Sequence, residues 1–565
     1  MRFHATFGYL GVVALLLAIA TPASAQSFRV QCPDNTITHP DPLGAGVNNA
    51  EPTFVGPTYA GTAGYPAAPT NVNGAIKCQQ ISGGDGYSTM GDGTQTYMFS
   101  FGPLSGLADI ATGKPGTEFP IVFNTPFTAT PGFVLAPGDP ATSLGGALPL
   151  PLSGLQLTAL AGFYNGAVGQ VPDLDSIGAG RCAYPCINGH VDARQVMDVG
   201  VMNGNIPAPL MAIDEDDEFF LTLTNVGMIM RPDLFEQHTV HFHGYPNASA
   251  FYDGVPDASV AISIAASFTY YYLAPDAGTY FWHCHISPPE HLQMGMVGQL
   301  YVRPRQNRVA AGTPLITALR TQQADLRMAC RRPGDGAPSP VPAVTSSPDI
   351  LCSNPVPAVS TAAVGGGMYA YNDGDGSTAY DVEYPLQIHG FDPNFHFVGM
   401  TFNPEGFTDM KDKYFLLNGR SYPDTVTPGP LQTLSADNVE HFSQPLPAII
   451  NITRGQRALL RISDLDVSEY QTLASLGIPM TVIGYNAKLL RDQAGNNLYY
   501  NTNSITLGGG ESLDVILDAC QVRAATGSCA TPYPVGTYYL YTPNLDHLSN
   551  DAENFGGLMT EVHVL

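Results

Sequence analysis

Positive charge is scarce in this sequence, and charge of either sign is limited. Lys and Arg number 23 against 48 Asp and Glu, charged residues make up 13% of the 565 positions, and the formal net charge is −25. Phosphate binding needs clustered Lys and Arg, so we expect no nucleic-acid partner.

Long apolar runs and long amphipathic helical patterns are also missing beyond the N-terminus. We therefore expect no membrane-spanning segment in the rest of the chain. Gly (60) and Pro (48) are abundant instead. That composition favours many short strands and turns over a helical protein.

The first 25 residues have the pattern of an export signal. Arg2 supplies a positive charge, Leu10 to Ala20 form an apolar run too short to span a bilayer, and Ala23-Ser24-Ala25 resemble a small-residue cleavage site. We expect a secreted or periplasmic protein whose mature chain begins at Gln26.

The cysteine count agrees with export. Nine cysteines outside the cytoplasm leave one unpaired, and Cys284 is our candidate for it. The other eight can then pair between neighbours along the chain. The local bridges that we expect are Cys182–Cys186 and Cys520–Cys529.

The chain is too long for one hydrophobic core, which predicts roughly two or three domains. Alternating strand-like runs and turn residues predict an all-β fold. The predicted segments are an export signal (1–25), a Gly/Pro-rich N-terminal region (26–190), a first strand-rich domain (191–305), a linker or long loop (306–379) and a second strand-rich domain (380–565).

An internal repeat relates the two strand-rich domains. The matching segments that we identify are Val240–Tyr245 with Met480–Tyr485, Gly278–Trp282 with Gly536–Leu540, and Gly295–Val302 with Gly557–Val564. The repeat predicts two related β domains in tandem.

Two short clusters carry the chemistry. The first is His238-Thr-Val-His241-Phe-His243, and the second begins with His283-Cys284-His285. Side chains alternate along a strand, so His241 and His243 share one face, and His238 faces the other way. Cys284 likewise points away from its two histidine neighbours. Each strand can therefore serve two adjacent metal positions.

One ligand set combines Cys284 with His238 and His291, which gives two imidazoles and one thiolate. Met296, five residues after His291, can supply a weak axial thioether. Such a set predicts a blue (type 1) copper site for electron transfer. Zinc uses the same residue types but seldom an axial methionine.

These motifs resemble the copper-binding domain of the multicopper oxidase family, as do Asp253-Gly-Val-Pro256 and Gly278-Thr-Tyr-Phe-Trp282. The resemblance covers residues 191–305 well and 380–565 moderately, and it implies tandem Greek-key cupredoxin sandwiches with copper as the cofactor. By the family pattern, the type 1 ligands correspond to His238, Cys284, His291 and Met296. The ligands of the type 2/type 3 cluster, which reduces oxygen to water, correspond to His241, His243, His283 and His285.

The sequence departs from the family pattern in two ways. Five residues rather than three separate His285 from His291, and this longer loop is similar to that of copper nitrite reductases. The family's His-to-Met spacing of five is kept, which favours Met296 over Met294 as the axial ligand. The complete cluster also needs eight histidines from two domains, whereas the repeat places other residues opposite the four histidines here: Thr481, Ile483, Tyr541 and Pro543.

Half of the cluster is therefore present. Its four histidines can hold one or two coppers alone, meet histidines of another subunit in a homo-oligomer such as a trimer, or face a different partner. Among the second-domain histidines, we expect His389 and His396 to be structural or surface residues and His547 to be the best candidate for a stray ligand.

The function that we expect is a copper-dependent oxidoreductase. It takes single electrons from a phenol or a metal ion, with Cys284, His283 and His285 as the electron path and oxygen or nitrite as acceptor. Electrons are expected to enter at an exposed His291, rimmed by negative charge from Glu290 and Asp257. The alternatives are a one-copper electron-transfer or copper-binding protein, and a structural protein with a vestigial site.

Overall fold

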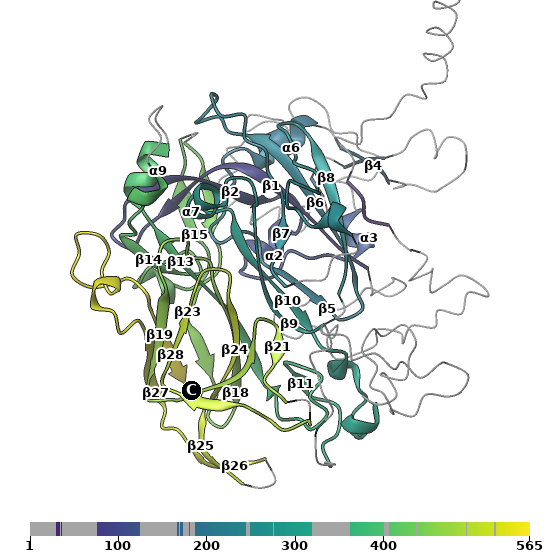
Figure 1. Ribbon diagram of the computed structural model, residues 1–565, viewed down its shortest axis with the longest axis vertical. Coiled ribbons are helices and arrows are strands. Elements are labelled where there is room, and N and C mark those ends of the chain that lie inside the picture. Colours follow the sequence, from purple (N-terminus) through teal and green to yellow (C-terminus); the bar gives the residue numbers. More distant parts are fainter. Residues whose placement is uncertain are drawn as a thin grey trace, which may run out of the picture.

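The computed structural model describes most of the two strand-rich domains (Figure 1). The predicted export signal and the predicted Cys182–Cys186 bridge lie outside the described residues. Within the described part, no helix is long and apolar enough to cross a membrane. The described residues are 30–33, 36, 76–124, 167–168, 170–172, 180, 187–191, 193–244, 249–274, 276–318, 357, 362–399, 406–436, 438–492, 494–524 and 527–565.

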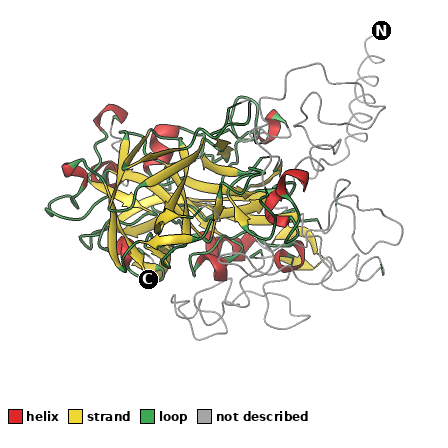
Figure 2. Cartoon of the chain, turned by 90° about the horizontal axis from the view of Figure 1, so that it is seen from below, coloured by secondary structure: helices red, strands yellow, loops and turns green. Residues whose placement is uncertain are grey.

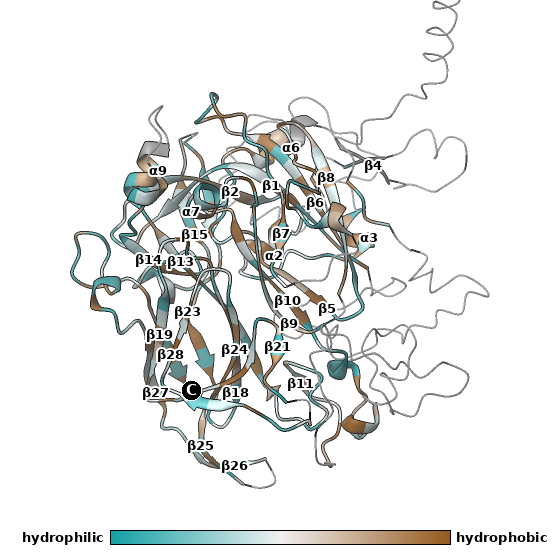
Figure 3. Ribbon diagram, in the orientation of Figure 1, coloured by the Kyte–Doolittle hydropathy of each residue, from teal (hydrophilic) through white to brown (hydrophobic). Residues whose placement is uncertain are grey.

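The first sandwich packs two four-stranded sheets around one core of buried aliphatic and aromatic side chains. One sheet has the order β2 (Gln95–Pro103), β1 (Ile76–Thr89), β6 (Glu218–Gly227) and β8 (Ser267–Leu273). The other has the order β5 (Met211–Asp214), β10 (Val297–Arg303), β9 (Gly278–His283) and β7 (His241–Phe242). Hydrophobic residues run along the strands of both sandwiches, brown in Figure 3.

The second sandwich repeats this arrangement with longer sheets. One sheet has the order β14 (Tyr414–Leu417), β13 (Val382–Phe391), β18 (Arg457–Asp464), β24 (Ser512–Asp518), β20 (Met480–Tyr485) and β21 (Lys488–Leu489), with β22 (Tyr500–Thr502) also paired to β20. The other has the order β17 (Ile450–Ile452), β28 (Met559–Val564), β27 (Gly536–Tyr541), β19 (Gln471–Leu476) and β23 (Ser504–Leu507).

In the described part of the chain, helices are short and lie around the edges of the strands (Figure 2). They are α2 (Leu107–Ile110), α3 (Pro120–Phe123), α6 (Ala193–Gly200), α7 (Pro288–Gln293) and α9 (Pro393–Gly399). The 3₁₀ turns are η3 (Ala250–Tyr252), η4 (Arg305–Arg308), η5 (Phe407–Asp409), η6 (Asp424–Val426) and η7 (Leu545–His547). Small two-stranded ribbons pair β3 (Gln170–Pro172) with β4 (Ile187–Val191), β11 (Met368–Tyr369) with β12 (Ala379–Tyr380), β15 (Leu431–Leu434) with β16 (Glu440–Gln444), and β25 (Cys520–Arg523) with β26 (Cys529–Pro532).

The strand orders of the two sandwiches match, so the predicted all-β tandem cupredoxin fold is confirmed. One detail of the predicted repeat is wrong. The strand β7 pairs with β9, and its counterpart is β19, which pairs with β27 in the same way. The segment Met480–Tyr485 forms β20 in the other sheet, because it pairs with β24. Its resemblance to Val240–Tyr245 is therefore local and does not reflect position in the fold.

Residues 76–103, which precede the predicted boundary at residue 191, form half of one sheet of the first sandwich. The strand β1 runs parallel to β6 and antiparallel to β2. It carries three glycines, Gly83, Gly84 and Gly86, and several polar residues. The sequence of this segment does not predict a strand, because glycine is depleted in strands.

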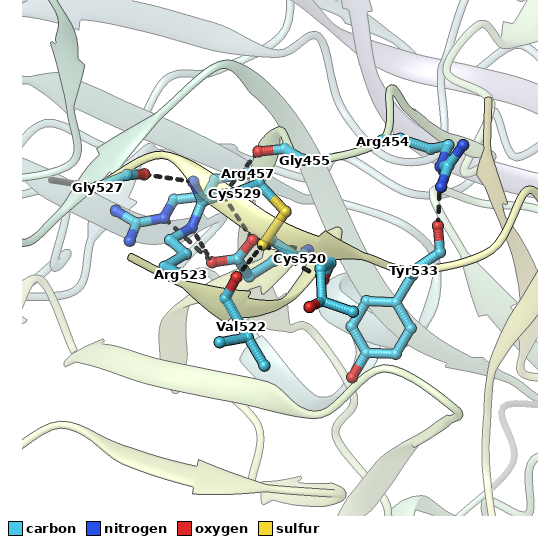
Figure 4. The surroundings of a disulfide bond; sticks show 11 residues. Arg454, Gly455, Arg457, Cys520, Val522, Arg523, Gly527, Cys529 and Tyr533 are labelled. Atoms are coloured by element: carbon cyan, nitrogen blue, oxygen red, sulfur yellow. Dashed lines mark hydrogen bonds and ion pairs between the residues drawn. A yellow bond between two sulfur atoms is a disulfide. The ribbon is translucent and has the colours of Figure 1, made fainter. Parts of the chain in front are cut away.

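Among the residues that the structure describes, two disulfides join cysteines that are neighbours along the chain. Cys520 and Cys529 link β25 to β26, as predicted (Figure 4). Cys32 and Cys78 tie an N-terminal segment to β1. Cys284 is the one free cysteine among the described residues, and it is buried.

A buried ion-pair network joins the two sandwiches. Glu383 on β13 accepts hydrogen bonds from the Nε atoms of Arg303 on β10, at 2.9 Å, and of Arg461 on β18, at 3.0 Å. Both guanidinium groups lie over the ring of Tyr301, at 5.5 and 4.6 Å from its centroid. The Glu383 side chain is 7% exposed, and the two arginines are at most 1% exposed. Two buried cations therefore share this carboxylate inside the domain interface, and Arg461 also lies 3.5 Å from Asp514.

We predict that Glu383→Gln destabilises the protein by about 3–5 kcal/mol, because it removes a charge that two buried cations share. Asp518→Asn is the matched control: Asp518 also accepts from two arginines, but its side chain is 24% exposed. The control should cost only about 0–1 kcal/mol. Urea unfolding followed by circular dichroism measures both, and equal losses would contradict the prediction.

Candidate metal centres

The structure brings His238, Cys284 and His291 together in the first sandwich. Their ligand atoms all lie within 4.8 Å of one another, and all three side chains are fully buried. His238 precedes β7, Cys284 directly follows β9, and His291 lies on α7. The Nδ1 atom of His291 is 3.2 Å from the Cys284 Sγ atom. Met296, also fully buried, follows α7, and its backbone carbonyl accepts a hydrogen bond from the Cys284 amide at 3.1 Å.

The polar atoms of this set fit a metal ion. Both ring nitrogens of His238 are buried and make no hydrogen bond, and the Nε2 atom of His291 also makes none. Burial, reinforced by His291, lowers the pKa of His238 well below its usual range, so its ring is neutral and offers a lone pair. An unpartnered buried imidazole is costly, and a metal bond satisfies it. Two imidazoles, a thiol and a nearby thioether form the donor set of a blue copper site.

Gly83 on β1 forms one wall of this set. A Cβ atom at Gly83 would lie 2.7 Å from His238 Cδ2 and 3.3 Å from Met296 Cε. Any other residue at this position would push against a ligand candidate. Sequence reasoning missed this contact because Gly83 lies 155 positions before His238 and belongs to a strand that was not expected.

His291 is not the exposed residue that the sequence suggested. Its side chain is fully buried, because α7 folds inward and the Phe99 ring packs edge-on against it at 5.2 Å. Burial lowers the pKa of His291, but the charge of Cys284, the contact with its Sγ atom and the nearby Glu236 carboxylate outweigh burial and raise the pKa to about 9.

A surface pocket of about 420 Å³ reaches this site through Glu236. The Oε2 atom of Glu236 is 3.6 Å from His291 Nε2. Glu236 is a residue that sequence reasoning missed, although it lies two positions before His238 and would share its face in a strand. Glu290 and Asp257, the expected rim, do not line this pocket. Its lining residues are Phe235, Glu236, Gln237, Ser263, Ile264 and Ile286.

The structure also gathers the four histidines of the second predicted set. The ligand atoms of His241, His243 and His283 lie within 4.8 Å of one another. The ring of His285 is 5.2 Å from that of His241 and 5.4 Å from that of His283. The antiparallel pairing of β7 with β9 causes this clustering, because it places His241 directly opposite His283.

Backbone contacts orient these rings. His241 Nδ1 donates to the carbonyl of Asp253 at 2.7 Å, and His283 Nδ1 donates to the carbonyl of Cys284 at 2.6 Å. Burial, together with the neighbouring His241, lowers the pKa of His243 to about 4. A backbone hydrogen bond with Gly510 opposes this shift but does not outweigh it. The Nε2 atoms of His243 and His283 then face each other at 3.1 Å. When the two rings are neutral and each carries its proton on Nδ1, both Nε2 atoms have a free lone pair. A metal ion between them would bind both lone pairs.

The second sandwich carries different residues at the matching positions. Strand pairing places Ala474 where His241 stands and Leu476 where His243 stands. Tyr541 replaces His283, and Thr542 and Pro543 follow it. Within the described part of the chain, both groups of residues able to hold a metal ion belong to the first sandwich.

His547 occupies the position of His291 in the second sandwich. Its ring stacks on Phe415 at 3.8 Å, and its Nε2 atom is 3.2 Å from Glu469, as His291 packs on Phe99 and contacts Glu236. Its Nδ1 atom is 3.0 Å from the Oε1 atom of Gln471, the counterpart of His238. His547 therefore corresponds in position to His291 and already has two partners, so the structure does not support the prediction that it is a stray ligand.

His389 and His396 are structural rather than surface residues. They are 2% and 0% exposed. The His389 Nε2 atom donates to the Leu292 carbonyl at 2.9 Å, and His396 Nε2 is 2.9 Å from the Gln293 carbonyl. Both therefore contact α7, the helix that carries His291.

Comparisons with known proteins agree with the motifs. Residues 187–307 match the family model described as multicopper oxidase. Laccase abr2 of Aspergillus fumigatus is 33% identical over 109 residues, 19% of this chain and 17% of that protein. Multicopper oxidase MCE of Talaromyces pinophilus is 33% identical over 112 residues, 20% of this chain and 17% of that protein. The chain thus spans 17% of the length of these two curated relatives.

Among solved structures, the blue copper oxidase from Nitrosomonas europaea is similar with a TM-score of 0.40 and 20% identity, over 64% of this chain and 78% of that one. The copper nitrite reductase from the same organism has a TM-score of 0.36 and 13% identity, over 64% and 85%. The family match indicates that the cofactor is copper. Together with the motifs that the sequence carries, it places residues 187–307 of this chain in the multicopper oxidase family.

Proposed function

We propose that this protein is an exported copper-dependent oxidoreductase that oxidises a small reduced substrate one electron at a time, with oxygen as the acceptor. The observation that carries the proposal is the fully buried set of His238, Cys284 and His291, in which both nitrogens of His238 have no hydrogen-bond partner. A buried structural histidine would have its ring nitrogens paired.

In this proposal two ligand sets hold copper. Bound copper supplies one-electron oxidation and reduction in both sets. The type 1 set is His238, Cys284, His291 and Met296, and the type 2/type 3 set is His241, His243, His283 and His285. Burial of the first set excludes water, and the backbone amide of Thr239 donates a hydrogen bond to Cys284 Sγ at 3.4 Å.

Cys284 connects the two sets through the chain. It is bonded on one side to His283 and on the other to His285, and its side chain points to the opposite face of the strand. Its carbonyl also accepts the hydrogen bond of His283 Nδ1 at 2.6 Å. A short covalent route therefore links the buried thiol to both histidines, which a one-copper carrier would not need.

The pocket above His291 favours an aromatic donor with an acidic hydroxyl, such as a phenol. Phe235 and Ile264 supply exposed apolar surface, 82% and 38% exposed. Glu236 Oε2 supplies an acceptor for the hydroxyl proton, and it lies 3.6 Å from His291 Nε2. A phenol in this pocket can lose its proton to Glu236 while its electron leaves toward His291.

The oxygen-reducing set needs further histidine ligands. The second sandwich does not supply them, because its matching positions hold Ala474, Leu476 and Tyr541. A homo-oligomer or another partner that brings histidines to His241 and His243 would complete it. Nitrite is the acceptor that fits a single copper at such an interface. A chain that binds copper in the type 1 set alone would instead be an electron-transfer or copper-binding protein.

We predict that Cys284→Ser abolishes the blue absorption band of the copper-loaded protein without unfolding it, because the thiolate is the source of that band. Thr542→Ser, at the corresponding position of the second sandwich, is the matched control and should keep the band. Visible absorption and far-ultraviolet circular dichroism give the two readouts. A band that survives in the Cys284 variant would refute the ligand assignment.

We also predict that Glu236→Gln lowers kcat/KM for phenolic donors by roughly ten-fold or more, because a charge-assisted hydrogen bond is lost. Steady-state oxidation of a phenol series measures this loss. Glu469→Gln, which removes the corresponding contact to His547, should leave kcat/KM unchanged. If both variants or neither lose activity, the pocket is not the donor site.

A further inference from the structure

We propose that the second sandwich is a clamp that holds the ligand helix α7 in place, so that His389, His396 and Asp412 are positioning residues for the type 1 set. This inference rests on the proposed function, since it gives the copper-free sandwich a part in the copper site. In Figure 1, α7 and α9 lie close together where the two sandwiches meet.

The helix α7 is weak on its own. It has six residues, begins with two prolines, and its N-cap Ser287 has a φ of 37° and makes no side-chain capping bond. Isolated helices of this length are unstable in water. Yet α7 must hold His291 and lead into Met296, two of the four type 1 ligand candidates. Contacts from elsewhere must therefore fix it.

The second sandwich supplies those contacts at the two residues after His291. The Leu292 carbonyl accepts from His389 Nε2 on β13 at 2.9 Å. The Gln293 carbonyl lies 2.9 Å from His396 Nε2 on α9, and the other ring nitrogen of His396 lies 2.6 Å from the Tyr97 carbonyl on β2. His396 thus bridges α7 to the strand that carries Phe99.

The side chain of Gln293 is held at both ends. Its Oε1 atom accepts from the Asp392 amide at 3.0 Å, and its Nε2 atom donates to Asp412 Oδ1 at 3.0 Å. Gln293 is fully buried, so each of these bonds replaces water that cannot reach it. Backbone and side chain of Gln293 are therefore fixed by two segments of the second sandwich, residues 392–396 and Asp412.

Asp412 is itself anchored in a chain of hydrogen bonds. Ser468 Oγ donates to Asp412 Oδ2 and to Asp466 Oδ1, and Gln471 Nε2 donates to Asp466 Oδ2 at 2.6 Å. Gln471 in turn meets His547 at 3.0 Å. The network ends at the position that corresponds to the type 1 site, where Gln471 and His547 stand in place of two ligand histidines. The second sandwich has a polar anchor where the first has its ligand set.

The test removes the clamp at Asp412 and follows α7. Asp412→Ala takes away the acceptor of Gln293, whereas Asp412→Asn retains an amide oxygen there. Burial and the neighbouring Asp466 raise the pKa of Asp412 well above its usual range, which makes asparagine a close substitute. His563→Ala is the control, a second-sandwich histidine that pairs with Glu561 on its own strand.

The first readout is amide hydrogen exchange of the copper-free protein. The amides of Met294, Gly295 and Met296 bond within the ligand loop and report its opening. In Asp412→Ala they should exchange about ten-fold faster, while the core strands keep their protection. Asp412→Asn and His563→Ala should exchange as the parent protein does. His389→Ala gives a second clamp variant if Asp412→Ala does not fold.

The second readout is the copper-loaded protein. Asp412→Ala should shift the visible absorption ratio, the parallel hyperfine splitting and the reduction potential of the type 1 signal, and Asp412→Asn should restore them. Unchanged exchange and spectra in both clamp variants would overturn the inference, as would faster exchange spread evenly over both sandwiches. If the parent protein shows no blue signal, the proposed function fails, while the exchange result still decides the clamp.

Discussion

The pairing of β7 with β9 is the constraint on which both candidate metal centres depend. It sets His241 opposite His283, so that the rings of one ligand set meet on one face. Strand alternation then turns Cys284 to the other face, where His238 and His291 approach it within 4.8 Å. A slip of one residue in this register would exchange the two faces and dismantle both sets.

The two sandwiches show how one scaffold serves two purposes. Strand order and pairing are shared, and each sandwich keeps a histidine packed against an aromatic ring beside a glutamate: His291 lies edge-on to Phe99, and His547 stacks on Phe415. Around His547, a glutamine and a threonine stand where His238 and Cys284 stand in the first sandwich. The two sandwiches therefore share the packing around His291 and His547. They differ in the neighbouring donor atoms, and these decide whether the position can bind a metal.

Much of this organisation could be predicted from the sequence, because it rests on local spacing. Alternation within His238–His243 and around Cys284 was enough to sort the residues into two sets, and turn-rich strand patterns gave the tandem sandwiches. Gly83, Glu236 and the clamp residue Asp412 were missed, because long-range packing brings them to the site. The buried state of His291 was missed for the same reason. A proline-rich loop is expected to be exposed, whereas packing against β2 and β13 folds α7 inward.

The most direct test of the account is the copper content of the purified full-length protein, measured by elemental analysis against protein concentration and oligomer mass. With both histidine sets able to hold metal, the account predicts about two or more copper ions per chain, together with oxygen uptake in the presence of a phenol. About one copper ion per chain, with a blue signal and no oxygen uptake, would contradict it.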